Sequence, residues 1–126
     1  MRNELQGDEE SVSPLNIYPP SQLVAASTDP LWLLVAHNKK ALQGWTEICV
    51  RMSGNAQRCY EWLRAHPKRP IPKRCYALRH KHYAGAYAYE VGSGDRVYYK
   101  LDEALRKVIV YYAGSHPASV PYPPAI

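Results

Sequence analysis

The 126-residue sequence lacks any uninterrupted apolar run as long as a membrane-spanning helix, which needs roughly 18 residues or more. Its first ten residues, MRNELQGDEE, are polar and acidic, whereas a secretory signal starts basic and continues into an apolar stretch. We therefore expect no association with a membrane, and the cytosol is the simplest compartment. The length predicts a single domain with one modest core.

Cysteine is also scarce in this chain. The three cysteines are Cys49, Cys59 and Cys75, and no two of them form a C-x-x-C pair. An odd number at scattered spacing does not make a disulfide framework, and the lack of a close pair gives no support for a zinc site. We expect three reduced, mostly buried thiols. The sequence indicates neither a metal ion nor another cofactor.

Acidic residues are scarce over most of the chain but not at its start. Residues 1–29 carry one basic and five acidic residues, a net charge of −4. The other 97 residues carry 15 basic and six acidic residues, a net charge of +9. Such a surplus attracts polyanions because binding releases counterions, although a merely soluble basic surface is the alternative. Residues 1–29 are also poor in large apolar groups, which predicts a flexible acidic tail followed by one domain over residues 30–126.

The first part of that domain has the pattern of a strand and two helices. The continuous apolar run 31–37 suits a buried strand. Residues 39–52 place apolar side chains at steps of three and four, and Asn38 is a suitable cap for this helix. The break Ser53-Gly54-Asn55 is expected to end it and to start a second helix over residues 55–66. The pair is then a helical hairpin.

The second part of the domain is rich in residues that favour strands. A Gly92-Ser93-Gly94-Asp95 turn joins two of these stretches into a hairpin, since glycine adopts positive φ at little cost. The order of elements predicts an α+β fold, with the helical hairpin on one face of a twisted antiparallel sheet of about four strands. The expected strands cover residues 75–80, 85–91, 96–101 and 107–114.

The alternation along residues 96–101 divides their side chains between the two faces of this sheet. Because the helical hairpin covers only one face, we expect the other face to be open to solvent. Glu90 should lie on the open face beside Arg96, across the tight turn. The set expected against the helices is Val97, Tyr99 and Leu101, and the set expected on the open face is Arg96, Tyr98 and Lys100.

Five short motifs follow one another between residues 78 and 117: Leu78-Arg79-His80, Gly85-Ala86-Tyr87, Gly94-Asp95, Arg96-Val97-Tyr98-Tyr99 and Gly114-Ser115-His116. In this order they resemble the C-terminal half of RelE/ParE-superfamily toxins of bacterial type II toxin–antitoxin systems. The resemblance extends in element order over roughly residues 31–117 and leaves residues 1–29 outside. It implies a fold similar to that of small microbial ribonucleases.

The resemblance implies two different activities. RelE-like members cleave messenger RNA on the ribosome without a metal, and an antitoxin that wraps the toxin neutralises them. The partners implied are therefore a cognate antitoxin, in a possible hetero-oligomer, together with the ribosome and mRNA. ParE-like members share the fold but inhibit DNA gyrase by binding. A gyrase inhibitor, or a decayed toxin that only binds its antitoxin, stays open as an alternative, because fold alone does not fix function.

The catalytic candidates are His116, Arg96 and Glu90. The resemblance places His116 where relatives carry a catalytic His or Arg, and its imidazole is suited to be the general acid. Arg96 matches the family's strand arginine and can bind a phosphate, or it can form an ion pair instead. Glu90 is the base favoured by its position, although RelE relatives carry lysines on this strand. A solvated salt-bridging carboxylate is the alternative for Glu90.

A second group of residues is expected to bind RNA through charge and ring stacking. Tyr122 lies six residues beyond His116, a spacing similar to that of a substrate-stacking tyrosine in RelE relatives. The alternatives are an ordinary residue in a proline-rich end for Tyr122, and a solvated loop or an antitoxin-binding surface for the basic cluster. The predicted RNA-binding residues are Lys73, Arg74, Arg79, His80, Lys81, Tyr98, Lys100 and Tyr122.

Overall fold

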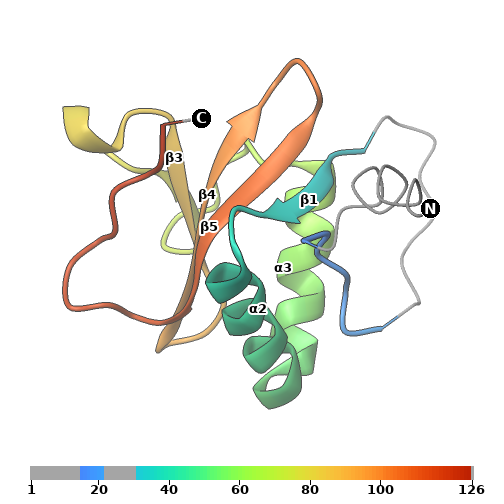
Figure 1. The fold of residues 1–126 in the computed structure, drawn as a ribbon. Helices are drawn as coiled ribbons and strands as arrows, with labels where there is room; N and C mark the ends of the chain where they lie inside the picture. Colours follow the sequence, from blue (N-terminus) through green and yellow to red (C-terminus); the bar gives the residue numbers. More distant parts are fainter. Residues whose placement is uncertain (1–14, 22–30, 126) are drawn as a thin grey trace, which may run out of the picture.

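The computed structural model of the chain describes residues 15–21 and 31–125. These residues have the α+β architecture expected from the sequence, and they contain two helices and one five-stranded sheet in the order β1-β5-β4-β3-β2 (Figure 1). The elements are β1 (Leu33–Ala36), α2 (Lys39–Arg51), α3 (Ser53–Ala65), β2 (Cys75–Ala77), the 3-10 turn η1 (Lys81–Tyr83), β3 (Ala86–Glu90), β4 (Asp95–Asp102) and β5 (Lys107–Ser115).

The sheet has five strands and is mixed, whereas about four antiparallel strands were predicted. Strands β2 to β5 form antiparallel neighbours, and β1 adds to the edge of β5 in parallel, with Leu34 opposite Val108. The two helices after β1 return the chain across the sheet, which is the kind of crossover that a parallel pair requires. The apolar run that formed β1 was visible in the sequence, but its partner and direction were not.

The helices bury the faces that their periodicity predicted. Asn38 caps α2, since its side-chain oxygen accepts a hydrogen bond from Ala41 N at 2.9 Å. The expected break at Ser53-Gly54-Asn55 is wrong, because only Met52 separates the helices and α3 begins at Ser53. The buried side chains are Ala41, Trp45 and Ile48 of α2 and Ala56, Cys59, Tyr60 and Leu63 of α3.

Helix α2 packs very closely on β5. A Cβ atom built on Gly44 would lie 1.8 Å from the backbone oxygen of Ala113, so only glycine allows this approach. Next to this contact the predicted inner set of β4, Val97, Tyr99 and Leu101, packs in the core with the helices. The face of the sheet that meets the helices is therefore a dry, tightly packed layer.

A short N-terminal segment, residues 15–21, extends the domain beyond the predicted start at residue 30. Asn16 forms an antiparallel bridge with Val35 of β1, and Ile17 is 2% exposed. The indole Nε1 of Trp45 donates a hydrogen bond to Tyr18 O at 2.9 Å. These seven residues of the predicted flexible tail thus pack on the core. The rest of that predicted tail lies outside the described residues.

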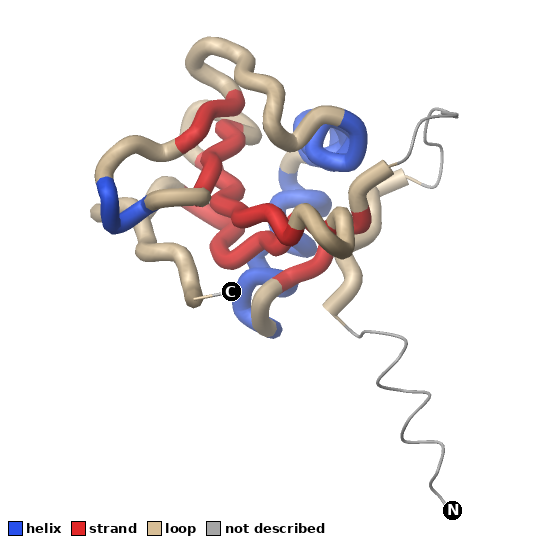
Figure 2. Tube along the Cα trace, turned by 90° about the horizontal axis from the view of Figure 1, so that it is seen from above, coloured by secondary structure: helices blue, strands red, loops and turns tan. Residues whose placement is uncertain are grey.

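The second face of the sheet, which was expected to be open, is covered. Residues 117–125, called here the C-terminal strap, run past the sheet on the side away from the helices (Figures 1 and 2). Beneath the strap, Tyr98 is 3% exposed, and Ala86 and Ala88 are fully buried. The prediction of a solvent-open face is therefore wrong, because the proline-rich end supplies a cover. No helix in the described ranges is long and apolar enough to span a bilayer.

Candidate functional site

The register of three strands brings the backbone of the predicted catalytic residues to one end of the sheet. Glu90 of β3 lies opposite Arg96 of β4, as expected, and Arg96 lies opposite Gly114 of β5. His116 follows β5 directly, and its backbone N donates to Gly94 O at 2.7 Å. His116 is thus a diagonal neighbour of Arg96, at a separation that long side chains can bridge.

Arg96 is held by the hairpin turn that precedes it. Its Nη1 donates to the carbonyl oxygens of Gly92 at 3.0 Å, Asp95 at 3.1 Å and Ser93 at 3.5 Å. Its Nη2 lies 3.6 Å from Glu90 Oε1, and the Arg96 side chain is only 11% exposed. The guanidinium therefore stabilises the β3–β4 hairpin, and a phosphate has to replace part of these contacts to bind it.

Glu90 is held between a phenol and a guanidinium. Its Oε2 accepts a hydrogen bond of 2.6 Å from the hydroxyl of Tyr76, while Oε1 faces Arg96. Burial and this bond to the Glu90 carboxylate raise the pKa of Tyr76 to about 12. The Glu90 side chain keeps 26% of its surface exposed, which leaves it reachable from solvent. Tyr76 was not among the predicted site residues.

His116 is exposed at the end of β5 and has a defined orientation. Its Nδ1 lies 2.8 Å from Pro117 O. Because a carbonyl oxygen only accepts, Nδ1 must carry the hydrogen of this bond. Nε2 is then the nitrogen available to exchange a proton with a substrate. This is the arrangement that a histidine acid–base group needs.

A buried carboxylate ties this end of the sheet to helix α2. Asp95, the first residue of β4, is 6% exposed and accepts from two nitrogens of Arg51, at 2.9 and 3.3 Å. Arg51 is the last residue of α2. The ion pair fixes the hairpin on which Arg96 sits and from which Gly94 bonds His116.

Seven of the eight predicted RNA-binding residues fall into two groups in the structure, and Tyr122 is described below. One group is exposed on the chain that surrounds the edge strand β2. In this group Arg74 also donates to Glu90 O at 3.0 Å. In the other group, Tyr98 is buried and Lys100 donates to Pro124 O of the strap at 3.3 Å, so neither lies on an open face. The exposed members are Lys73, Arg74, Arg79, His80 and Lys81.

Four rings gather where η1 meets the strap. His80 stacks on His82 at 4.9 Å between ring centroids, and Tyr122 lies 5.7 Å from His82 and 5.2 Å from Tyr83. Tyr122 remains 67% exposed. His80 adopts a φ of 92°, a conformation that favours glycine, and its Nδ1 accepts from His82 N. His80, His82 and Tyr122 were visible in the sequence as candidates for binding RNA, whereas Tyr83 was not, although HKHY is a compact signal.

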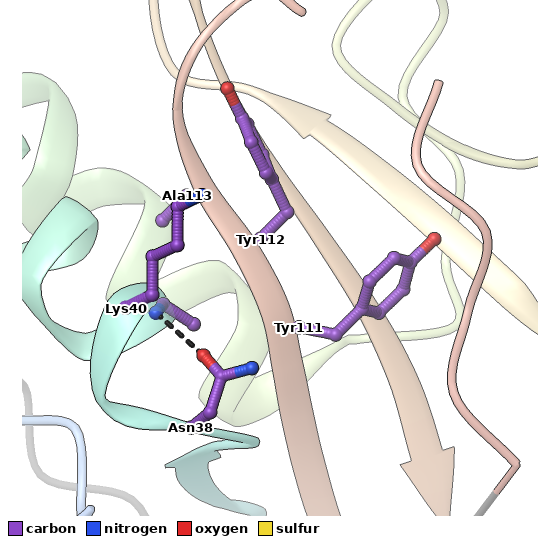
Figure 3. Close-up of a pocket in the computed structure, with 6 residues that line it drawn as sticks. Asn38, Lys40, Tyr111, Tyr112 and Ala113 are labelled. Atoms are coloured by element: carbon purple, nitrogen blue, oxygen red, sulfur yellow. Dashed lines mark hydrogen bonds between the residues drawn. The ribbon is translucent and has the colours of Figure 1, made fainter. Parts of the chain in front are cut away.

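A small hollow separates the start of α2 from the middle of β5 (Figure 3). Asn38, Lys40, Ala113 and two tyrosines line it. Figure 3 shows Tyr111 and Tyr112 pointing in different directions, as consecutive residues of a strand do. Three polar groups of this hollow are already engaged within the chain, since Asn38 caps α2 and the phenols of Tyr111 and Tyr112 each donate to a carbonyl. In the described ranges, no three His, Cys, Asp or Glu side chains gather closely enough to hold a metal ion.

Comparisons with known proteins give a likeness in structure and none in sequence. No protein-family model matches the chain, and no curated protein matches it by sequence. The chain is similar in structure to the toxin–antitoxin complex RelBE2 from Mycobacterium tuberculosis, at 14% sequence identity and a TM-score of 0.45. The likeness covers 73% of this chain and 98% of the matched chain.

Proposed function

We propose that the protein is the toxin of a type II toxin–antitoxin system and acts as a ribosome-dependent mRNA endonuclease of the RelE type. The observation that supports the proposal is the neighbouring backbone position of Glu90, Arg96 and His116 at one end of the sheet. The five sequence motifs of residues 78–117 support the same function, because they resemble motifs of RelE/ParE-superfamily toxins.

The chemistry needs no metal, because RNA supplies its own nucleophile. A base removes the proton of the 2′-OH, the 2′-oxygen bonds to phosphorus, and the bond from phosphorus to the 5′-oxygen breaks. In this proposal Glu90 is the base, and Arg96 stabilises the charge that grows on the phosphate oxygens. Protonated His116 gives its Nε2 proton to the departing 5′-oxygen.

The surroundings of these residues suit a polyanionic substrate and an acidic inhibitor. Exposed cations follow one another from Lys73 to Lys81, and the ring cluster beside them offers surfaces on which unpaired bases can stack. We propose that this surface contacts mRNA and the ribosome, and that a cognate antitoxin neutralises the toxin by covering it. The eight predicted RNA-binding residues remain predictions, with Tyr98 and Lys100 beneath the strap.

One observation favours a second candidate, a protein that acts by binding alone. Arg96 donates to three backbone carbonyls and faces Glu90, so its charge is already used within the chain. A gyrase inhibitor, or a decayed toxin that binds only its antitoxin, needs no free arginine at this position. Cleavage of RNA, rather than binding, therefore separates the two candidates.

The test uses purified protein with ribosomes programmed by a defined mRNA, and new 5′ ends are mapped by primer extension. We expect cleavage by the parent chain and a loss of about 100-fold or more in cleavage rate for His116→Ala, since a general acid contributes about that much. The matched control is His37→Ala, which removes an exposed imidazole directly after β1, at the opposite edge of the sheet from β2.

Two results would overturn parts of this proposal. If His116→Ala cleaves as fast as the parent, His116 is not the acid. If the parent yields no new 5′ ends with translating ribosomes, the nuclease proposal is wrong, and binding to gyrase or to an antitoxin is the activity to measure. Circular dichroism of each variant checks that the fold is intact.

A further inference from the structure

The C-terminal strap covers the face of the sheet on which the candidate site lies. The residues beneath the strap include Ala86, Ala88 and Tyr98. They are buried, but they do not belong to the core on the helix side of the sheet. Figure 1 shows the strap and the helices on different sides of the sheet. The strap therefore closes a second, thinner layer with its own buried residues.

Side chains of the domain hold the strap by its carbonyl oxygens. The hydroxyl of Tyr83 donates to Val120 O at 3.2 Å, and the hydroxyl of Tyr111 donates to Pro121 O at 3.2 Å. The third bond is made by Lys100, whose Nζ donates to Pro124 O at 3.3 Å. Figure 3 shows the Tyr111 ring pointing away from α2, toward the chain on the far side of β5. Three separate elements, η1, β5 and β4, thus each contribute one bond.

The strap does not join the sheet as a strand. Among the described residues, no backbone–backbone hydrogen bond outside the helices and strands involves residues 117–125. Four of its nine residues are prolines, which have no N–H to donate to a ladder. A cover that is held by a few side-chain bonds can leave without breaking a ladder, whereas a sixth strand could not.

The face beneath the strap combines rings and a cation. Tyr98 and Tyr111 lie 6.3 Å apart between ring centroids, and Lys100 follows two residues after Tyr98 on the same side of β4. Arg96 precedes Tyr98 by two residues on that side, so the row leads directly to the catalytic candidates. Aromatic rings beside cations are the usual surface for a single-stranded nucleic acid.

We propose that the C-terminal strap is a displaceable cover that keeps this face closed, and that its departure opens a binding surface for single-stranded RNA made by Tyr98, Tyr111 and Lys100. The choice of RNA as the ligand rests on the proposed function. Only molecules with the strap displaced can bind RNA on this face. The apparent RNA affinity is therefore the affinity of the open form multiplied by the fraction of molecules that are open.

The size of the effect follows from the bonds that hold the strap. Removing one neutral hydrogen bond changes an equilibrium constant by about fivefold. Tyr83→Phe and Tyr111→Phe each remove one strap bond and keep the ring. Each variant should bind RNA about fivefold more tightly than the parent, and the double variant should approach about 25-fold if the two bonds are independent.

The experiment measures two quantities on the full chain, on these variants and on a chain that ends at His116. Anisotropy of a fluorescein-labelled single-stranded RNA of about 12 nucleotides gives affinity. Acetylation by N-acetylimidazole, located by mass spectrometry, gives the accessibility of Tyr98. We expect RNA affinity and the acetylation of Tyr98 to rise together from the parent to the single variants, the double variant and the shortened chain. The matched control is Tyr112→Phe, whose hydroxyl donates to Ser115 O rather than to the strap, and it should match the parent.

The results that overturn the proposal are distinct from those that overturn the nuclease. If Tyr98 becomes reactive in Tyr83→Phe or Tyr111→Phe, which both keep Tyr122, while RNA affinity is unchanged or lower, the strap is not a cover over an RNA surface. If Tyr98 stays unreactive in the chain that ends at His116, the strap is not what closes this face. These measurements use no ribosome. If the strap leaves and RNA binds but no RNA is ever cleaved, the proposed nuclease function is wrong and the proposal for the strap still holds.

Discussion

The two faces of the sheet are closed in different ways. On the helix side, Val97 and Tyr99 are fully buried among side chains of α2 and α3, and Gly44 brings the helix backbone onto that of β5. On the other side, nine residues of extended chain lie over Tyr98 and are held by hydrogen bonds to their carbonyls. The same strand, β4, supplies alternate residues to both layers.

This difference separates stability from function within one sheet. The helix-side layer excludes water over a large apolar area, which is the main source of stability in a small domain. The strap-side layer contains the charged side chains that we propose to act on RNA, namely Glu90, Arg96 and Lys100, and its cover is thin. Local opening belongs to such a layer, because few buried contacts are lost when it opens.

The largest expected effect lies on the helix side, at Gly44. In Gly44→Ala the new methyl group would lie 1.8 Å from the Ala113 backbone oxygen, so helix α2 has to move away from β5. Overpacking of this kind costs about 3 kcal/mol or more when backbone must shift. Urea unfolding followed by circular dichroism should show this loss of stability.

The matched control for Gly44 is the glycine of the other helix. In Gly54→Ala the nearest atom outside the local helix backbone is Arg58 Nη1 at 3.9 Å, so a methyl group fits. Alanine favours a helix over glycine, and we expect a gain of about 0.5 kcal/mol. Equal stability changes for the two substitutions would contradict the close approach of α2 and β5.

A smaller effect concerns the tyrosine that the helix-side core encloses. Burial raises the pKa of Tyr99 well above its ordinary value of 10.0, and the neighbouring Cys75 adds to this. The unfolded chain therefore loses this proton near pH 10 while the folded chain keeps it. The contribution of Tyr99 to the free energy of unfolding is fully present below pH 10. It declines above pH 10 by about 1.4 kcal/mol for each pH unit.

Tyr99→Phe removes the phenol group that titrates, and it therefore tests whether Tyr99 causes the loss of stability at high pH. Urea unfolding between about pH 9 and pH 11 should show a shallower decline for Tyr99→Phe than for the parent. At neutral pH this variant should be less stable by about 1 kcal/mol, because the hydroxyl donates to Pro67 O at 2.6 Å. Val97→Ala is the control, since it weakens the same core without removing a titratable group. If stability falls with pH equally steeply in Tyr99→Phe and in the parent, the raised pKa of Tyr99 is contradicted.

The helix-side layer could be predicted from the sequence almost completely. The three- and four-residue steps of Trp45 and Ile48 identify a helical face, and the alternation of Val97 and Tyr99 identifies the inner side of a strand. These patterns are local and repeat with the period of the backbone. The Glu90–Arg96 register followed in the same way from a four-residue turn of glycine, serine and aspartate.

The strap-side layer could not be predicted, because its contacts have no local pattern. Nothing in SVPYPPAI indicates that its carbonyls accept from Tyr83, Tyr111 and Lys100. The engagement of Arg96 by the turn carbonyls likewise depends on how the hairpin folds back. The partner and direction of β1 were missed for the same reason, since the pairing joins residues more than 70 positions apart.

The most direct test of the account is to map which face of the sheet contacts RNA. Backbone amide shifts of the ¹⁵N-labelled full chain and of the chain that ends at His116 would be followed during titration with single-stranded RNA. The account predicts shifts along residues 86–90, 96–100 and 114–116, larger in the shortened chain, with helices α2 and α3 little changed. Shifts confined to the helices, or absent from residues 96–100 and 114–116 in both chains, would contradict it.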